Sequence, residues 1–400
     1  MKEDIIRPPV LLRAAIAAIV LLTAFTLDLP GESGLSLSPH GTTTAQTAGP
    51  SSPAKVIVMG DSLSIGCCAP IDETWPSLLT KRLGAELENL AQGTTTSESL
   101  ISMDRTFPSG RTQSQLDEAL SLIVESDNVA AVTLAVGIIE FLLVDPDTGV
   151  NCFVAGTSAC EELFQAASEN LQANLHFIVG ELHAAMDPGT PLLMMNYYFG
   201  SDWKLNTIIL SESQEHGAMF VNLAEYFRNR HSELQIDWIH KNELGHRVIA
   251  DLLTNAVPPD SDGDGLSDLM EGILNSDPAM TDSDGDDCLD GVEFGPQRSA
   301  GGRRDPMNFW DFFDTPDINN VRDKAITISD IGRIVARFGT FGDPAIDPLS
   351  QPLPSGYHTA FDRTPLGPNV WNLGAPNGSV MIQDIGLSVA QFGHSCAGTP

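Results

Sequence analysis

The chain has 400 residues, which is more than one ordinary domain requires and enough for two or three. It holds 21 lysine and arginine residues against 53 aspartate and glutamate residues, for a formal net charge of −32. This balance argues against a nucleic-acid partner, because phosphate contacts need lysine and arginine, and it argues against docking on anionic lipid for the same reason. A soluble secreted protein or a cation binder fits the charge better.

The N-terminal segment has the features of an export signal. Basic residues precede an apolar run of 14 residues from Ala14 to Leu27. This run suits the core of a signal peptide and is shorter than the roughly 20 residues that span a bilayer. We interpret residues 1–30 as a signal peptide, with an uncleaved membrane anchor as the alternative. Residues 31–53 are rich in Ser, Thr, Gly and Pro and predict a disordered linker. The protein is therefore expected to be secreted or held at the cell surface.

Export to an oxidising compartment favours disulfide bonds among the six cysteines over free thiols. The pair Cys152–Cys160 would close a short loop, and the pair Cys288–Cys396 would tie the C-terminal segments together. Cys67 and Cys68 are adjacent and have no obvious partner.

Strand-like and helix-like segments alternate between residues 54 and 257. Strands are predicted over 55–60, 86–90, 129–137, 191–199 and 219–223. Helices are predicted over 75–83, 113–125, 161–186 and 242–254. This alternation predicts an α/β fold, a three-layer α/β/α sandwich with a mostly parallel sheet. Ligands of such folds bind beyond the carboxyl ends of the strands, so the chemistry is expected just after Met59, Leu90 and Val136.

Three polar residues of this region can form a serine hydrolase triad. Ser62 directly follows the first predicted strand, and Asp237 and His240 lie three residues apart on one loop. His240 can face Ser62 as the base while Asp237 accepts a hydrogen bond from the other ring nitrogen. A serine in a strand-to-helix turn is often only a helix N-cap, but the presence of Asp237 and His240 favours catalysis.

The motifs around these residues resemble those of the SGNH (GDSL-type) hydrolases over about residues 54–257. GDSLS (60–64) matches the first family block, NLAQGT (89–94) the second, and Asp237-x-x-His240 with the following Gly245-His246 the last. The resemblance implies an esterase or lipase that cleaves small-molecule, lipid or acylated-glycan esters without a catalytic cofactor. It assigns the role of nucleophile to Ser62, and it gives the oxyanion to the backbone amides of Ser62 and Gly93.

The third block departs from the family pattern G-x-N-D, because the chain has Ile139 where the asparagine is expected. An aliphatic side chain cannot donate a hydrogen bond, and the loss of one oxyanion donor typically costs about 10²–10³ in turnover. Three interpretations follow. The enzyme is slow, Asn196 at the next strand end replaces the donor, or the domain is a decayed scaffold in a non-catalytic extracellular binding or adhesion protein.

The other histidines are interpreted as ordinary residues, and the sequence has no H-E-x-x-H motif that would predict a zinc hydrolase. His246 is expected to make local hydrogen bonds at the start of the last helix. Four further histidines are expected to be surface or core residues: His176, His183, His216 and His231.

Residues 258–297 predict a calcium-binding region. Twelve acidic residues and no lysine or arginine lie between Pro258 and Gly295, and they repeat the spacing of a calcium loop after 22 residues. The run resembles thrombospondin type 3 repeats, which implies structural Ca²⁺; a solvated acidic linker is the alternative. The predicted ligands are Asp260, Asp262, Asp264, Asp268 and Glu271 in the first loop and Asp282, Asp284, Asp286, Asp290 and Glu293 in the second.

Residues 305–400 contain an internal repeat, because 324–339 matches 378–393 with a period of 54 residues. The repeat resembles a dockerin-type duplicated module, which implies a cohesin-like partner. We consider an intramolecular calcium-stabilised cap the more favoured alternative. The calcium ligands would be degenerate, with Asn319, Asp323 and Asp330 in the first unit and Asn377 and Asp384 in the second.

Overall fold

A computed structural model describes residues 53–142, 158–198, 203–237, 239–367 and 369–397. The chain divides into two units, Met1–Pro50 and Ser51–Pro400, and only the second contains described residues. The predicted signal segment, the linker up to residue 52 and Cys152 therefore lie outside the described residues. Within the described ranges, no helix is both long and apolar enough to cross a membrane.

The core of the N-terminal domain is a parallel sheet, as the alternation of segments predicts. The strand order is β2-β1-β5-β6-β7, and every neighbouring pair runs parallel. The strands are β1 (Lys55–Gly60), β2 (Glu86–Asn89), β5 (Val129–Ala135), β6 (Leu192–Met195) and β7 (Met219–Val221). The chain passes from β1 to β2 on one side and then returns to β5 on the other. Open α/β sheets bind their ligands beyond the carboxyl ends of the strands at such a reversal, which here lies between β1 and β5.

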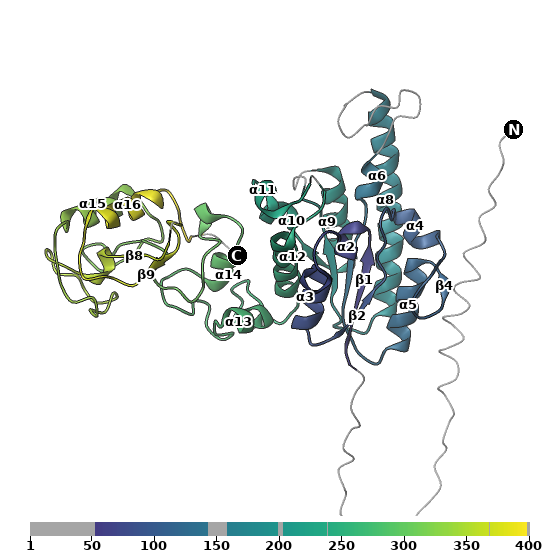
Figure 1. Ribbon diagram of the computed structural model, residues 1–400, viewed down its shortest axis with the longest axis horizontal. Helices are drawn as coiled ribbons and strands as arrows, with labels where there is room; N and C mark the ends of the chain where they lie inside the picture. Colours follow the sequence, from purple (N-terminus) through teal and green to yellow (C-terminus); the bar gives the residue numbers. More distant parts are fainter. Residues whose placement is uncertain (1–52, 143–157, 199–202, 238, 368, 398–400) are drawn as a thin grey trace, which may run out of the picture. The chain divides into compact units, whose positions relative to one another are not determined.

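Helices cover both faces of this sheet and complete three layers (Figure 1). One layer contains α3 (Trp75–Arg82) and α12 (Glu243–Asn255), which pack on each other. The other contains α5 (Gln115–Glu125), α8 (Ser158–Ala185) and α9 (Lys204–His216). The shorter elements are α2 (Ser62–Ile65), η2 (Ile71–Glu73), α4 (Ser97–Ser102), β3 (Arg105–Thr106), β4 (Thr112–Gln113), α6 (Ile138–Phe141), α10 (Leu223–Phe227) and α11 (His231–Leu234).

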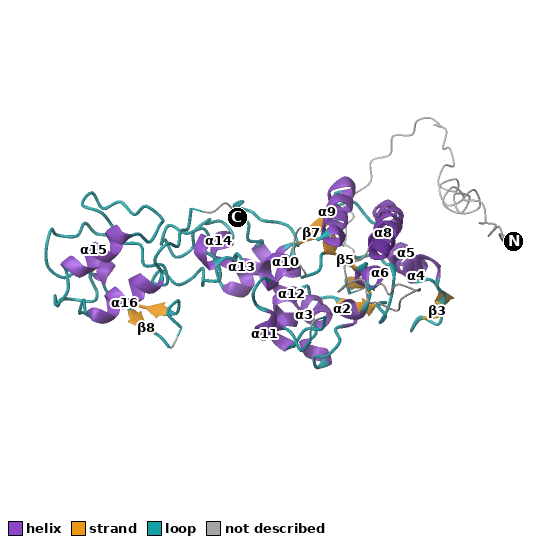
Figure 2. Ribbon diagram, turned by 90° about the horizontal axis from the view of Figure 1, so that it is seen from above, coloured by secondary structure: helices purple, strands orange, loops and turns teal. Residues whose placement is uncertain are grey.

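The C-terminal part consists of short elements joined by long loops (Figure 2). Its elements are α13 (Asp268–Leu274), α14 (Asp290–Phe294), η3 (Arg298–Ala300), α15 (Ile328–Ala336), η4 (Thr359–Phe361), β8 (Thr364–Pro365), β9 (Leu373–Gly374) and α16 (Ile382–Ala390). A second hydrophobic core includes Phe313, Ile334 and Phe361. The predicted Cys288–Cys396 disulfide is confirmed and joins the acidic region to the end of the duplicated module.

The sequence repeat corresponds to a structural repeat. In the first unit, Asp330 accepts hydrogen bonds from the backbone N–H groups of Thr315 and Thr327. In the second unit, Asp384 accepts equivalent bonds from Arg363 and Met381. Each aspartate thus closes the first turn of its helix, α15 or α16, and joins the helix to a segment that precedes it.

Candidate active site

The turn after β1 requires glycine at position 60. Gly60 has a φ of +132°, and a Cβ at this position would lie 2.0 Å from the carbonyl oxygen of Ala135 in the neighbouring strand. The side chain of Gln115 holds the turn from the other side, since its Oε1 accepts a hydrogen bond of 2.6 Å from the Gly60 amide. Two strands and α5 therefore fix the point at which the chain leaves the sheet.

Asp61, and not Ser62, caps the short helix that follows. The Asp61 side chain accepts a hydrogen bond of 2.9 Å from the Leu63 amide. Ser62 is the first residue of the helix and is half-buried, and its hydroxyl makes no hydrogen bond with any residue that the structure describes. The interpretation of Ser62 as a mere N-cap is therefore wrong, and its hydroxyl is free to act on a ligand.

The loop before α12 holds the predicted acid–base pair. Asp237 Oδ2 lies 2.9 Å from His240 Nδ1, and Asp237 Oδ1 accepts hydrogen bonds from the amides of Ile239 and His240. These hydrogen bonds, chiefly those from His240, lower the pKa of Asp237 to about 2. A carboxylate that stays ionised on Nδ1 leaves Nε2 of the neutral ring to act as a base.

An unpredicted disulfide links the nucleophile turn to this loop. Cys67 and Cys68 are bonded to each other, and their sulfur atoms and a ring nitrogen of His240 all lie within 4.8 Å of one another. The Cys67 amide also donates to the carbonyl of Ser62 at 3.4 Å. The structure thus places Ser62 and His240 on neighbouring segments at one edge of the sheet, without a direct hydrogen bond between their side chains among the described residues.

The backbone amide of His246 makes the local hydrogen bond expected of it, to the carbonyl of Asn242 at 2.9 Å, and its side chain strengthens the connection to the nucleophile turn. The side chain is buried at the start of α12. Its Nε2 lies 3.0 Å from the carbonyl oxygen of Cys67, and its Nδ1 accepts a bond of 3.4 Å from the Trp75 amide. The Gly-His pair after the catalytic loop therefore ties α12 to the segments that follow β1.

The backbone can provide two donors for an oxyanion. Among the described residues, neither the Ser62 amide nor the Gly93 amide donates a hydrogen bond to another group. Asn89 shapes the turn that leads to Gly93, since it accepts a bond from the Ala91 amide and donates one of 3.0 Å to the carbonyl of Ser64. The second motif is thereby fixed against the nucleophile helix.

The expected third donor is absent, and Asn196 does not replace it. Ile139 packs against the hydrophobic core from α6. The Asn196 side chain is buried beyond β6, where it donates to Asn222 Oδ1 at 2.9 Å and accepts from the Ala224 amide at 3.1 Å. The alternative in which Asn196 serves the oxyanion is therefore wrong, since its amide holds the end of the sheet instead.

Buried polar residues outside the proposed triad surround the site. Burial raises the pKa of Asp61 to about 7 and that of Glu140 above its ordinary value. Lys241 is buried beside His240, where its Nζ stands over the ring of Tyr198, and burial lowers its pKa to about 6. Tyr198 Oη donates to the carbonyl of Ile239 and so supports the catalytic loop. Lys241 follows His240 directly in the sequence, but only its burial distinguishes it from a surface lysine.

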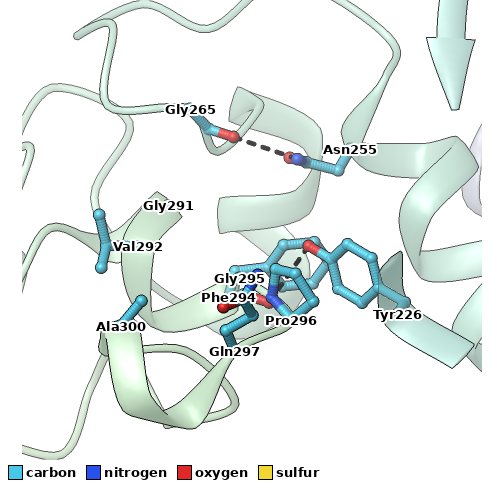
Figure 3. A pocket seen from close by; sticks show the side chains of 10 residues that line it. All are labelled: Tyr226, Asn255, Gly265, Gly291, Val292, Phe294, Gly295, Pro296, Gln297 and Ala300. Atoms are coloured by element: carbon cyan, nitrogen blue, oxygen red, sulfur yellow. Dashed lines mark hydrogen bonds between the residues drawn. The ribbon is translucent and has the colours of Figure 1, made fainter. Parts of the chain in front are cut away.

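A separate pocket of about 410 Å³ lies between α10, the end of α12 and the acidic region (Figure 3). The Tyr226 hydroxyl donates to the carbonyl of Phe294 there, and the Asn255 side chain donates to the carbonyl of Gly265. None of the proposed catalytic residues lines this pocket, and we assign it no function.

The first acidic loop gathers carboxylate oxygens without partners. Both oxygens of Glu271 and Oδ2 of Asp262 are buried and accept no hydrogen bond from the described residues. Burial, together with neighbouring carboxylates, raises the pKa of Glu271 to about 7. Asp260 accepts from the amides of Gly263 and Gly265. Asp268 accepts from Ser261. Only some of the predicted ligands therefore have free oxygens, while the others shape the loop.

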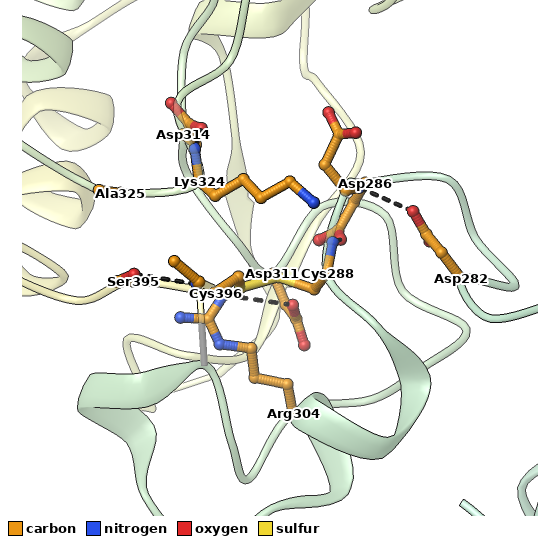
Figure 4. Close-up of a disulfide and its surroundings, with 12 residues drawn as sticks. Asp282, Asp286, Cys288, Arg304, Asp311, Asp314, Lys324, Ala325, Ser395 and Cys396 are labelled. Atoms are coloured by element: carbon orange, nitrogen blue, oxygen red, sulfur yellow. Dashed lines mark hydrogen bonds and ion pairs between the residues drawn. A yellow bond between two sulfur atoms is a disulfide. The ribbon is translucent and has the colours of Figure 1, made fainter. Parts of the chain in front are cut away.

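The second acidic loop forms a similar cluster beside the Cys288–Cys396 disulfide (Figure 4). Asp290 accepts from Ser283, as Asp268 does from Ser261 in the first loop. Burial raises the pKa of Glu293. Arg304 and Asp311, which no loop motif includes, also lie at this cluster, and Arg304 Nη1 is 4.0 Å from Asp311 Oδ1. Buried oxygens that accept no hydrogen bond from the described residues belong to Asp284, Asp286, Glu293 and Asp311, of which Asp311 faces Arg304.

The carboxylates and amides of the duplicated module mainly shape turns. Both oxygens of Asp330 and of Asp384 accept backbone hydrogen bonds. The remaining predicted ligands make hydrogen bonds within their own loops. The Asn319 side chain donates to Asp317, and the side chains of Asp323 and Asn377 accept from the amides of Ala325 and Ser379. Among the described residues of the two repeat units, buried carboxylate oxygens without a hydrogen-bond partner belong instead to Asp314 and Asp362, which the repeat pattern does not identify.

Comparisons with known proteins give only distant likenesses. No family model and no curated protein matches the chain. The chain is similar to a salicylyl-acyltransferase from a tetracycline biosynthetic pathway, with 18% identity over 52% of this chain and 55% of that one and a TM-score of 0.34. It is also similar to a putative lipolytic protein of the G-D-S-L family from Desulfitobacterium hafniense DCB-2 (13%, 51% and 99%, TM-score 0.35). A third similar structure is a catalytic mutant of an acetylxylan esterase from Geobacillus stearothermophilus. Its sequence is 13% identical over 52% of this chain and 96% of that one, with a TM-score of 0.35.

Proposed function

We propose that the protein is a secreted serine hydrolase of the SGNH type that cleaves carboxylic esters through an acyl-Ser62 intermediate. The observation that carries this proposal is that Asp61, and not Ser62, caps the helix after β1. Because Asp61 caps α2, the Ser62 hydroxyl stays free at the carboxyl edge of the sheet. The paired Asp237 and His240 lie on the neighbouring segment.

The reaction follows from these positions. Ser62 Oγ attacks the ester carbonyl while His240 takes its proton, and Asp237 stabilises the imidazolium that forms. The amides of Ser62 and Gly93 donate to the oxyanion of the tetrahedral intermediate. His240 then gives the proton to the leaving alcohol. In the second half, His240 takes a proton from water, the hydroxide attacks the acyl-serine, and the acid leaves as Ser62 regains its proton.

Hydrolysis of p-nitrophenyl acetate tests the proposal. Ser62→Ala should abolish turnover, and a fluorophosphonate should label Ser62 in the intact protein. Ser64→Ala is the matched control, because Ser64 lies two residues further along the same helix but is fully buried. Equal rates for wild type and Ser62→Ala would exclude the proposal. Surface glycan binding that persists in Ser62→Ala, without labelling or turnover, would favour the alternative of a binding or adhesion protein.

For the acidic region we propose structural calcium binding. Buried carboxylate oxygens without partners are costly unless a cation neutralises them, and carboxylates are the ligands that Ca²⁺ prefers. The free oxygens of Asp262 and Glu271 fit a first ion. Those of Asp284, Asp286 and Glu293 fit a second, to which Asp311 adds a ligand from outside the loop.

For the duplicated module, a cohesin-like partner is a further proposal. Equivalent positions of the two units expose apolar side chains, which is the type of surface that proteins use to bind one another. The exposed pairs are Ile328 and Ile382, Val335 and Val389, and Phe338 and Phe392. Replacing Phe338 and Phe392 together by serine should abolish capture by a cohesin module and leave ester hydrolysis unchanged. Absence of any binding by the wild type would exclude this partner.

A further inference from the structure

Two histidines and two glutamates converge where α8 packs against α9 (Figures 1 and 2). His176 comes from the middle of α8, and Glu212, Glu215 and His216 come from the last turn of α9. Residues that are three or four positions apart on a helix share one face, so all three α9 residues can point to His176. None of these residues belongs to the proposed active site.

The distances within this cluster match those of a tetrahedral metal site. His176 Nδ1 lies 3.2 Å from Glu212 Oε2 and 3.2 Å from His216 Nε2. It lies 3.7 Å from Glu215 Oε1, and His216 Nε2 lies 3.8 Å from Glu212 Oε2. Four ligands at zinc bond lengths of about 2.0–2.1 Å in tetrahedral geometry are about 3.3 Å apart. The four measured separations, each of which includes His176 or His216, are therefore close to those between the ligands of a zinc ion.

Hydrogen bonding alone does not satisfy this arrangement. A nitrogen of a neutral imidazole either donates or accepts one hydrogen bond, so His176 Nδ1 can use only one of its three close contacts in this way. Glu212 is 1% exposed, and a carboxylate so deeply buried needs a positive partner. A cation at the centre of the four ligand atoms would bind all of them at once. The cluster also lies at the C-terminus of α9, where the helix dipole favours positive charge.

We propose that His176, Glu212, Glu215 and His216 bind one zinc ion, which clamps α8 to α9. The ion would have four protein ligands and no open position, so its role is structural and not catalytic. The ring of His216 packs over Gly180 of α8, with its Cε1 3.7 Å from the position that a Cβ there would take, so the two helices are in contact at this cluster. This site is independent of the proposed ester hydrolysis.

Zinc chloride titrated into the full-length protein tests the site by calorimetry. Saturating calcium chloride is present throughout, so that the acidic region does not compete for zinc. His176→Ala with His216→Ala should lower the number of bound zinc ions by one. Each single variant should weaken binding at this site at least about 100-fold, because even the loss of an outer partner of a metal ligand costs about 10- to 100-fold.

His183→Ala is the matched control, because His183 is an exposed histidine further along the same α8. This variant should bind zinc with the wild-type stoichiometry and affinity. Co²⁺ provides a second readout, since a tetrahedral site gives an intense visible absorption that the double variant should lose. Equal zinc stoichiometry in wild type and double variant, or an octahedral Co²⁺ spectrum in the wild type, would overturn the proposal. Because His176 is half-exposed, its replacement should leave the fold intact.

Discussion

The Tyr197 hydroxyl donates a hydrogen bond of 2.5 Å to Asp61 Oδ2, and both side chains are buried. This bond joins the segment after β6 to the residue that caps the helix of Ser62. Tyr197 follows a strand far along the chain, and no motif marks it as a partner of Asp61. The position of the proposed nucleophile therefore depends on the packing of the whole sheet edge.

Asp61 makes stability depend on pH in a defined direction. Burial raises its pKa in the folded protein from the ordinary 3.8 to about 7. Between these values the unfolded chain binds fewer protons than the folded one, so the contribution of Asp61 to the free energy of unfolding falls as pH rises and levels off above pH 7. Asp61→Asn keeps a good capping residue and should flatten the profile. Urea unfolding at several pH values measures this, with Asp72→Asn, an exposed position, as the control. A profile of Asp61→Asn as steep as that of wild type would contradict the assignment.

Ile139→Asn should raise the turnover of ester hydrolysis. The change supplies the side-chain donor that the third motif lacks, and one such donor is worth about 10²–10³ in turnover. Part of the new amide would be buried where Ile139 now packs against the core, and this burial costs free energy. The expected increase in kcat is therefore about tenfold or more. The measurement is kcat for p-nitrophenyl acetate, with Ile139→Val as the control that keeps an aliphatic side chain. An unchanged kcat in Ile139→Asn would show that the oxyanion already has a third donor.

The sequence was sufficient to predict the parallel sheet and the contact between Asp237 and His240, while the approach of this pair to Ser62 stays a prediction. Strands of apolar residues have a strong periodic signal, and Ser62, Asp237 and His240 lie in short motifs whose spacing reflects local geometry. The Cys288–Cys396 pair was also predicted. The Cys67–Cys68 bond was not predicted, because disulfides between adjacent cysteines are rare.

The features that the sequence did not predict are contacts between residues that are distant in sequence. The partners of His246 are Cys67 and Trp75, which precede it by more than 170 residues. Asp311 completes the second acidic cluster from outside the loop that predicts it. His176 approaches His216 only because two long helices pack together. No local pattern carries these pairings, so only the fold reveals them.

Removing the Cys67–Cys68 disulfide should lower catalysis. The disulfide lies beside His240, and the Cys67 carbonyl is the acceptor that fixes His246. Without the bond this turn can relax, and a misplacement of about 1 Å near reacting groups can cost about 100-fold in rate. Cys67→Ala with Cys68→Ala should therefore reduce kcat for p-nitrophenyl acetate by about 10- to 100-fold. The control is Cys288→Ala with Cys396→Ala, which removes a disulfide outside the hydrolase domain and should leave kcat unchanged. Equal loss of kcat in both double variants would refute a local effect.

Calcium should stabilise the protein through the two acidic clusters. The buried carboxylates repel each other, so a bound ion adds stability by mass action, about 2.7 kcal/mol at a concentration of 100 times Kd. In a chain of 400 residues, where 1 kcal/mol shifts Tm by about 1–2 °C, two such ions predict a rise in Tm of about 5–10 °C, which EDTA should reverse. Glu271→Gln and Glu293→Gln should each remove part of the rise, because both oxygens of each carboxylate are buried without a partner among the described residues. Asp277→Asn is the control, since Asp277 is acidic but exposed between the two loops. A solvated linker would give the same Tm with calcium and with EDTA, and differential scanning fluorimetry distinguishes the two outcomes.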